Sequence, residues 1–148
     1  MSKPRIRALE AADRPRWNAL WAGYLAFYEC ELPAAITELN WQRLMDPARQ
    51  PFGLAAVDGE RVVGFVHYHF HLSTWSATSY CYLEDLFVDP KARGGGAGRA
   101  LIEAVYEAAA RERASRVYWH TRGDNKTARA LYDEVAQLSP FVQYRHGD

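Results

Sequence analysis

The stretch Tyr82-Leu83-Glu84-Asp85-Leu86-Phe87-Val88-Asp89-Pro90 leads, after Lys91 and Ala92, into Arg93-Gly94-Gly95-Gly96-Ala97-Gly98-Arg99. Its first half is rich in aromatic and aliphatic residues, which predicts a strand over residues 80–88. Apolar residues at helical spacing follow the glycines and predict a helix over residues 98–113. The glycines therefore mark a strand-to-helix turn in which the backbone can come close to a ligand.

The turn has the features of an anion-binding site. The first turn of the following helix offers unpaired N–H groups and a partial positive charge, and Arg93 and Arg99 add cationic donors. This combination suits a pyrophosphate. No Gly-Lys-Ser/Thr triplet is present, and a dinucleotide fingerprint begun at Gly94 would meet Arg99 at its sixth position. ATP hydrolysis and nicotinamide chemistry are therefore disfavoured; a flexible loop without a ligand is the alternative.

The rest of the chain alternates between helical and extended patterns. We expect a strand over 5–9, helices over 13–28 and 36–44, a hairpin of 52–57 and 62–72 about Asp58-Gly59, a strand over 117–121, a helix over 126–136 and a last strand over 141–146. This order predicts an α/β (α+β) chain built on one mixed sheet. The length predicts a single domain over residues 1–148.

Composition limits the partners. The formal net charge is zero, which argues against a nucleic-acid partner held by bulk electrostatics. No apolar run approaches the ~20 residues that a membrane helix needs, and residues 1–16 contain no apolar block typical of a signal peptide. Cys30 and Cys81 are the two cysteines, which favours a reducing compartment. We therefore expect a cytoplasmic protein without nucleic-acid or membrane partners.

Three motifs in order resemble the GNAT superfamily of N-acetyltransferases. The glycine turn, read from Arg93 to Gly98, is similar to its signature Gln/Arg-x-x-Gly-x-Gly/Ala. Residues 82–90 look like its central strand, and the segment from Asn125 to Tyr132 looks like Asn-x-x-Ala-x-x-x-Tyr. The resemblance is closest to the branch of polyamine and histone-type acetyltransferases. It implies a mostly antiparallel sheet flanked by helices, a splay between two central strands, and a homodimer.

The resemblance also implies a set of binding roles. Acetyl-CoA would be the cosubstrate, without a metal, and the acceptor would be a primary amine of a small molecule or peptide. The backbone of Leu86, Phe87 and Val88 would pair with the pantetheine arm, and the amides from Gly94 to Arg99 would hold the pyrophosphate. Asn125 would contact the arm, while Tyr132 would protonate the departing thiolate. The other reading of Tyr132 is a core aromatic residue on an amphipathic helix.

Amine acetylation needs a group that removes a proton from the amine. Glu84 is the preferred base, acting directly or through water, and Asp85 is a candidate for attracting a cationic substrate. Ion pairs with Lys or Arg are the alternative for both. Strand alternation places the two carboxylates on opposite faces unless a bulge intervenes. One face would then carry the following side chains: Tyr80, Tyr82, Glu84, Leu86 and Val88.

Histidines and early aromatic residues leave alternatives open. His67, His69 and His71 alternate along one strand and so share a face, where they could line a substrate groove or belong to a metal-binding protein. The outer two would lie ~13 Å apart, too far to share one metal. His120 is an alternative base. The early helices carry a further aromatic set, of which one or two would line the acceptor site: Trp17, Trp21, Tyr24, Tyr28 and Trp41.

Two further points concern the function class and the C-terminus. A non-catalytic acyl-CoA-binding sensor or subunit of the same fold is the alternative to an enzyme, although the presence of Tyr132 and Glu84 favours catalysis. After the second signature helix the superfamily often has a glycine next to an aromatic residue. Here the chain reads Leu138-Ser139-Pro140-Phe141, so the entry of the last predicted strand departs from the pattern.

Overall fold

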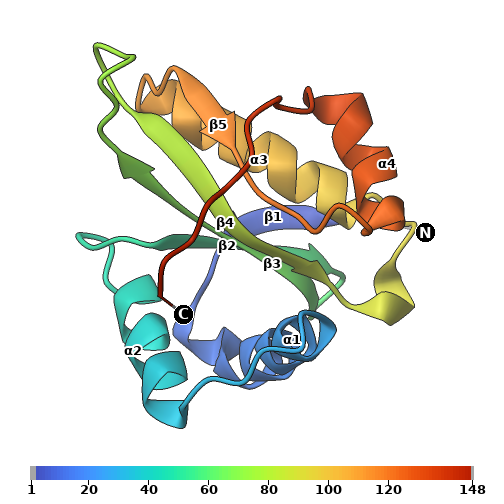
Figure 1. Ribbon diagram of the computed structural model, residues 1–148. Coiled ribbons are helices and arrows are strands. Elements are labelled where there is room, and N and C mark those ends of the chain that lie inside the picture. The colour runs from blue at the N-terminus through green and yellow to red at the C-terminus, as the bar shows by residue number, and fades with distance from the viewer. Residues whose placement is uncertain (1–2, 148) are drawn as a thin grey trace.

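A five-stranded sheet forms the centre of the computed structural model, which describes residues 3–147 (Figure 1). Its strands are β1 (Arg5–Ala8), β2 (Phe52–Asp58), β3 (Arg61–His71), β4 (Tyr80–Val88) and β5 (Arg116–Tyr118). They lie in the order β1-β2-β3-β4-β5, and only the β4–β5 pair is parallel. The predicted mixed, mostly antiparallel sheet is thereby confirmed.

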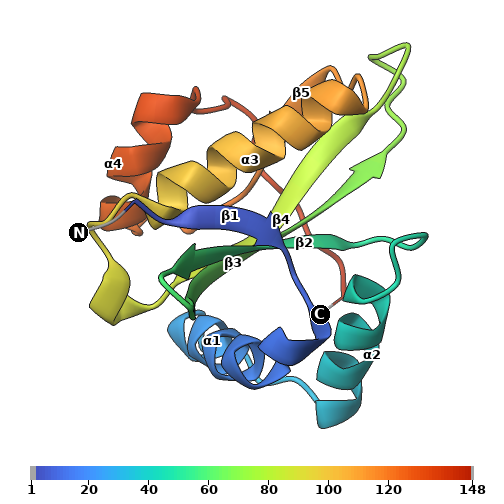
Figure 2. The same ribbon diagram turned by 180° about the vertical axis from the view of Figure 1, so that it is seen from behind.

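Helices cover both faces of the sheet (Figures 1 and 2). One face packs against α1 (Arg14–Phe27) and α2 (Ala34–Leu44), and the other against α3 (Ala97–Arg111) and α4 (Lys126–Val135). The core under α1 and α2 is built around Trp17, whereas α3 buries Leu101 completely on the opposite face. Full burial of such apolar side chains contributes about 1.5–3 kcal/mol each. None of the described helices is both long and apolar enough to span a bilayer.

The hairpin of β2 and β3 turns at the predicted Asp-Gly pair. Asp58 and Arg61 close the ladder, and Gly59 between them takes a φ of +64°. A positive φ is easy for glycine and strained for other residues, so the sequence signal and the turn geometry agree. The hairpin brings the long strand β3 beside β4, which carries the two predicted carboxylates Glu84 and Asp85.

A β-bulge in β4 changes which side chains share a face. In the pairing with β3, Asp85 lies opposite His67 and Leu83 opposite Tyr68, which leaves Glu84 as the extra residue. An extra residue shifts the alternation by one position. Leu86 and Val88 therefore pack on the α3 side of the sheet, together with Cys81 and Leu83.

The predicted common face is consequently wrong beyond the bulge. Leu86 and Val88 do not share a face with Glu84. Glu84 and Asp85, in contrast, both turn toward α1 and α2, where they contact His69 and His67 of β3. One inserted residue thus brings the two carboxylates together.

Strands β4 and β5 separate soon after they meet. Their pairing ends at Tyr82 and Tyr118, while β4 continues for six residues to Val88. The strand predicted over 117–121 therefore ends early, at Tyr118. The edge of β4 beyond Tyr82 faces the opening between the two strands, in agreement with the expected splay.

The last predicted strand, over 141–146, is wrong. Residues 137–147 contain no helix or strand, and Phe141, Val142 and Tyr144 are exposed rather than alternately buried. The three-residue β5 offers a short edge, and the segment has no buried face to hold it there. After α4 this C-terminal segment crosses the molecule toward α2 (Figures 1 and 2).

Candidate active site

The residue that follows β4, Asp89, carries a carboxylate that fixes the end of the strand. Asp89 accepts a hydrogen bond from the Lys91 N–H (3.0 Å) and one from Arg16 of α1 (3.1 Å). Arg16 also donates to the Val62 carbonyl (2.9 Å). The Lys91 N–H and then the Arg16 guanidinium hold the pKa of Asp89 below its usual value, despite some opposing burial. An ionised Asp89 thus ties α1 to the start of the glycine loop.

The glycine loop has the backbone shape that its sequence predicts. Gly94 and Gly96 have φ angles of +90° and +87°, and Gly96 caps α3. No other heavy atom lies within 4 Å of the position that a Cβ would take at either glycine. The left-handed backbone is readily adopted by glycine and strained for other residues. The open space leaves room for a ligand at the helix N-terminus, which fits a phosphate group.

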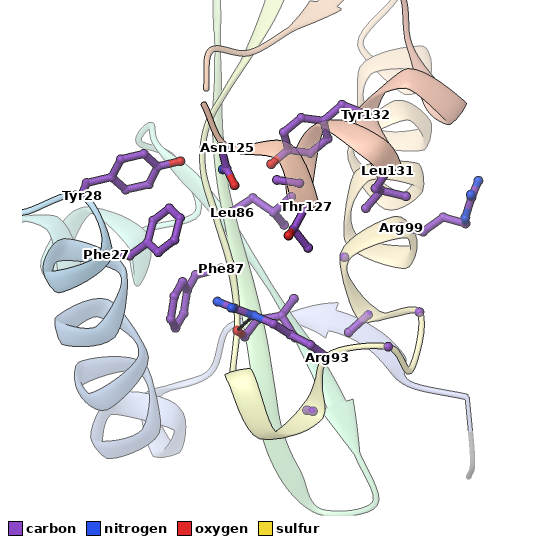
Figure 3. A pocket seen from close by; sticks show the side chains of 17 residues that line it. Phe27, Tyr28, Leu86, Phe87, Arg93, Arg99, Asn125, Thr127, Leu131 and Tyr132 are labelled. Atoms are coloured by element: carbon purple, nitrogen blue, oxygen red, sulfur yellow. Dashed lines mark hydrogen bonds between the residues drawn. The ribbon is translucent and has the colours of Figure 1, made fainter. Parts of the chain in front are cut away.

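A cavity of about 450 Å³ lies between this loop, β4, α4 and the end of α1 (Figure 3). We call it the loop cavity. All predicted donor-site residues except Gly95 line it: Leu86, Phe87, Val88, Arg93, Gly94, Gly96, Ala97, Gly98, Arg99, Asn125 and Tyr132. Tyr28, which belongs to the aromatic set predicted near the acceptor site, lines it too. Further lining residues were missed by the sequence reasoning: Phe27, Ala92, Thr127, Ala128 and Leu131. One cavity therefore joins the two sequence motifs.

The two arginines of the loop already have partners within the protein. Arg93 donates from Nε to the Val88 carbonyl (3.2 Å), and its guanidinium lies 5.4 Å from the centre of the Phe87 ring. Arg99 forms an ion pair with Glu134 of α4. Arg93 is thus held at the end of β4, while Arg99 is drawn toward α4, which leaves the loop amides as the more direct anion donors.

Tyr132 and Asn125 both reach the loop cavity from α4 and its N-cap. The hydroxyl of Tyr132 points into the cavity, toward that of Tyr28 on the opposite wall (Figure 3). Burial, with a smaller effect of Tyr28, raises the pKa of Tyr132 to about 12. Tyr132 is therefore a protonated donor at neutral pH. Asn125 donates from Nδ2 to Thr121 Oγ1 (3.0 Å), which orients its amide.

A second cavity, of about 490 Å³, opens on the α1 and α2 side of the sheet. We call it the carboxylate cavity, because Glu84 and Asp85 line it together with His67. Its other walls are mainly aromatic and aliphatic, with one cation from the C-terminal segment: Trp21, Tyr24, Leu25, Leu32, Ile36, Leu44 and Arg145. Tyr28 lines both cavities. The two cavities are therefore neighbours along β4.

The two carboxylates differ in exposure and in partner. The Asp85 side chain is 14% exposed, and its Oδ2 lies 3.0 Å from His67 Nδ1. The Glu84 side chain is 51% exposed, and its Oε1 lies 3.2 Å from His69 Nε2. Both carboxylates thus pair with histidines rather than with the Lys or Arg of the predicted alternative. Burial and then the Asp85 carboxylate raise the pKa of Tyr24, which keeps that hydroxyl protonated.

The family follows from the comparison with known proteins. The model of the acetyltransferase (GNAT) family matches residues 15–136, which include β4, the glycine loop, Asn125 and Tyr132. The protein belongs to this family. It is accordingly an acetyltransferase, as the resemblance of its three motifs predicts.

Relatives of the acetyltransferase are named for amine substrates. The D-amino-acid N-acetyltransferase of Saccharomyces cerevisiae is 36% identical over 142 residues, which cover 95% of this chain and 88% of that protein. The thialysine N-epsilon-acetyltransferase of Bos taurus is 39% identical over 74 residues, covering 50% of this chain and 43% of that protein.

Solved structures share the fold. The ribosomal-protein-alanine N-acetyltransferase of Brucella melitensis has a TM-score of 0.78 at 21% identity and covers 98% of this chain and 99% of its own. A probable acetyltransferase has a TM-score of 0.83 at 21% identity, over 97% of both chains.

The histidines of the acetyltransferase serve separate contacts. His67 is buried against Trp17 and Asp85, His69 meets Glu84, and His71 lies 2.6 Å from the Tyr118 hydroxyl. Among residues 3–147, no three His, Cys, Asp or Glu side chains are grouped to hold a metal ion. His120 lies near the Tyr82 hydroxyl (3.2 Å) and lines neither cavity.

The aromatic set of the early helices divides into core and site. Trp17, Trp21 and Trp41 are buried in the core, and Trp21 also lines the carboxylate cavity with Tyr24 and Tyr28. Helical spacing relates Trp17, Trp21, Tyr24 and Tyr28 along α1 and its C-cap, so the pattern alone does not distinguish core from site. Thr127, Ala128 and Leu131 could have been found from the sequence, because they lie on α4 between the two signature residues.

Proposed function

We propose that this acetyltransferase moves the acetyl group of acetyl-CoA to a primary amine, with the thioester in the loop cavity and the amine in the carboxylate cavity. One observation carries the proposal: consecutive residues of β4 line both cavities. Glu84 and Asp85 border the second, Leu86 to Val88 border the first, and Tyr28 belongs to both walls. The two reactants would therefore meet beside the bulge.

The donor side fits acetyl-CoA in its shape and its backbone. Gly94 and Gly96 leave open space at the N-terminus of α3, which suits a pyrophosphate. Beyond Tyr82 the edge of β4 toward β5 pairs with no strand among residues 3–147, so its peptide groups are available to the amides of the pantetheine arm. Acetyl-CoA supplies an acyl thioester, whose carbonyl carbon is open to attack by an amine.

Tyr132 acts as the general acid in this proposal. The departing thiolate leaves more readily when it receives a proton. With a pKa of about 12, Tyr132 holds its proton at neutral pH and can donate it from α4 into the loop cavity. Its position opposite Tyr28 places it at the boundary between the two cavities (Figure 3).

Glu84 acts as the general base, directly or through water. The acceptor amine must lose a proton to become a nucleophile. The Glu84 side chain is half exposed, so it can take up this proton and return it to solvent. Asp85 is more enclosed and is better placed to bind the positive charge of the amine before the reaction.

The acceptor is a small-molecule amine. The relatives in Saccharomyces cerevisiae and Bos taurus are named for D-amino acids and for thialysine, which are amines of small molecules. The carboxylate cavity offers two acidic groups against a largely apolar wall, which suits a compact cation with an apolar body. We therefore place amino acids and related amines before peptides among the acceptors.

A thiol-release assay tests the function. The protein is incubated with acetyl-CoA and, separately, with D-amino acids, thialysine, polyamines and a short peptide, and release of free CoA is followed. We expect release that depends on the amine above the background hydrolysis measured without it. Binding of acetyl-CoA by calorimetry, without turnover of any amine class, would instead favour the non-catalytic acyl-CoA-binding alternative.

A further inference from the structure

His67 is a buried histidine with both ring nitrogens occupied. The residue is 4% exposed. Its Nε2 lies 3.0 Å from the indole Nε1 of Trp17, and its Nδ1 lies 3.0 Å from Asp85 Oδ2. An indole N–H can only donate, so His67 Nε2 must accept and carries no proton. The proton of the neutral ring therefore sits on Nδ1 and is donated to Asp85.

The surroundings prevent the ring from turning away. Trp17 is fully buried in the core under α1 and α2. Phe65 stacks on the His67 ring at 4.6 Å between centroids, and Trp21 lies at 5.5 Å. A second rotamer would break two hydrogen bonds at once at a residue that is 4% exposed. The geometry thus fixes both the orientation and the tautomer of His67.

The hydrogen bond from His67 also orients Asp85. One of its oxygens accepts from His67, while the carboxylate lines the carboxylate cavity next to Tyr24. Glu84 stands beside it because of the bulge, but it is exposed and meets the partly exposed His69. The cavity therefore contains one enclosed carboxylate bonded to a buried histidine and one half-exposed carboxylate, which suits division between binding a charge and moving a proton.

We propose that His67 is a positioning residue that holds Asp85 in place to bind the ammonium group of the acceptor. The inference rests on the proposed amine acetylation. His67 does not take the proton of the substrate, because neither of its nitrogens is free. The ionisable groups around this site come from every neighbouring element: Asp85 and Glu84 on β4, His69 on β3, Tyr24 and Tyr28 on α1, Cys30 after it, and Arg145 of the C-terminal segment.

Two substitutions at His67 separate positioning from packing. His67→Asn keeps an amide N–H near the position of Nδ1, whereas His67→Leu fills similar space without a donor. We expect the KM for the amine to rise about tenfold in His67→Leu and to stay near that of the wild type in His67→Asn. The KM for acetyl-CoA should not change in either. His71→Leu is the control, because His71 lies on the same strand face and lines neither cavity.

A spectrum of the wild type provides a test that needs no turnover. Ring ¹⁵N shifts of His67 should report the Nδ1–H tautomer, because Nε2 accepts from the Trp17 indole. An Nε2–H tautomer, or an amine KM in His67→Leu equal to that in His71→Leu, would overturn the proposal. If the wild type acetylates no amine, the proposed function fails, and the tautomer still decides whether His67 holds Asp85.

Discussion

Replacing Gly96 with alanine tests the glycine loop most directly. Gly96 has φ +87° and ψ 6°, and no neighbouring heavy atom lies within 4 Å of the added Cβ. The methyl group therefore clashes with nothing, and its effect is confined to the backbone. A left-handed conformation costs an ordinary L-residue about 1–2 kcal/mol relative to the right-handed one.

The size of the effect on binding follows from where this strain appears. The loop is exposed at Gly96, so the free variant can relax toward an ordinary backbone conformation. Acetyl-CoA would have to restore the original shape in order to meet the loop amides. The strain then appears as a loss of affinity of about 5- to 30-fold, the equivalent of about 1–2 kcal/mol.

Calorimetric titration with acetyl-CoA measures this loss, and Gly59→Ala is the matched control. Gly59 also has a positive φ, of +64°, with open space around it, but it lies in the β2–β3 turn and lines neither cavity. We expect Gly59→Ala to lower the free energy of unfolding by about 1 kcal/mol and to leave the Kd for acetyl-CoA unchanged. An unaltered Kd in Gly96→Ala would refute the assignment of the loop to the pyrophosphate.

Three further perturbations follow from the structure. Tyr132→Phe should lower kcat about 100-fold with a nearly unchanged Kd for acetyl-CoA; an unchanged kcat in steady-state assays would exclude Tyr132 as the acid. Arg145→Gln should raise KM about tenfold for amino acids but not for their amides, because Arg145 lines the carboxylate cavity; equal effects on both would argue against a carboxylate contact. The Arg7 hydrogen bond lowers the pKa of Asp13, so its stabilisation is present at neutral pH and is lost as the pH falls below about 4. Urea unfolding at several pH values should show this loss in the wild type and not in Asp13→Asn; identical profiles would contradict it.

The local elements of the fold could be predicted because their signals are local. Asp58-Gly59 specifies a hairpin turn, and the glycines before α3 specify a strand-to-helix turn. The bulge could not be predicted, because the position of the extra residue depends on how β3 pairs with β4. The apolar residues of segment 141–146 predict a last strand, but the structure leaves them exposed. A strand there would need a sheet edge to pair with, which the local sequence does not reveal.

The candidate site was predictable where neighbours in sequence are neighbours in space. Leu86 to Val88 and the glycine loop lie on one continuous segment, and Asn125 and Tyr132 share one short helix with its cap. Tyr28 and Arg145 reach the cavities from distant parts of the chain. The sequence pattern gives the three alternating histidines the same predicted role, and only the burial of His67 against Trp17 distinguishes it from the other two.

The single extra residue at Glu84 has a consequence for how this enzyme can change. Leu83 before it and Leu86 and Val88 after it pack on the α3 side, whereas Phe87 packs on the side of α1 and α2, the side on which Glu84 and Asp85 line the carboxylate cavity. Deleting Glu84 would restore regular alternation with Leu83 still opposite Tyr68 and Asp85 still opposite His67, so the cavity would lose one carboxylate and keep the other. Under the proposed roles, substitutions at Glu84 and Asp85 would alter the choice of amine and leave the lining of the loop cavity intact. Under the same roles, new substrate preferences could evolve or be engineered at the bulge without changing the glycine loop, which begins only after β4 has ended at Val88.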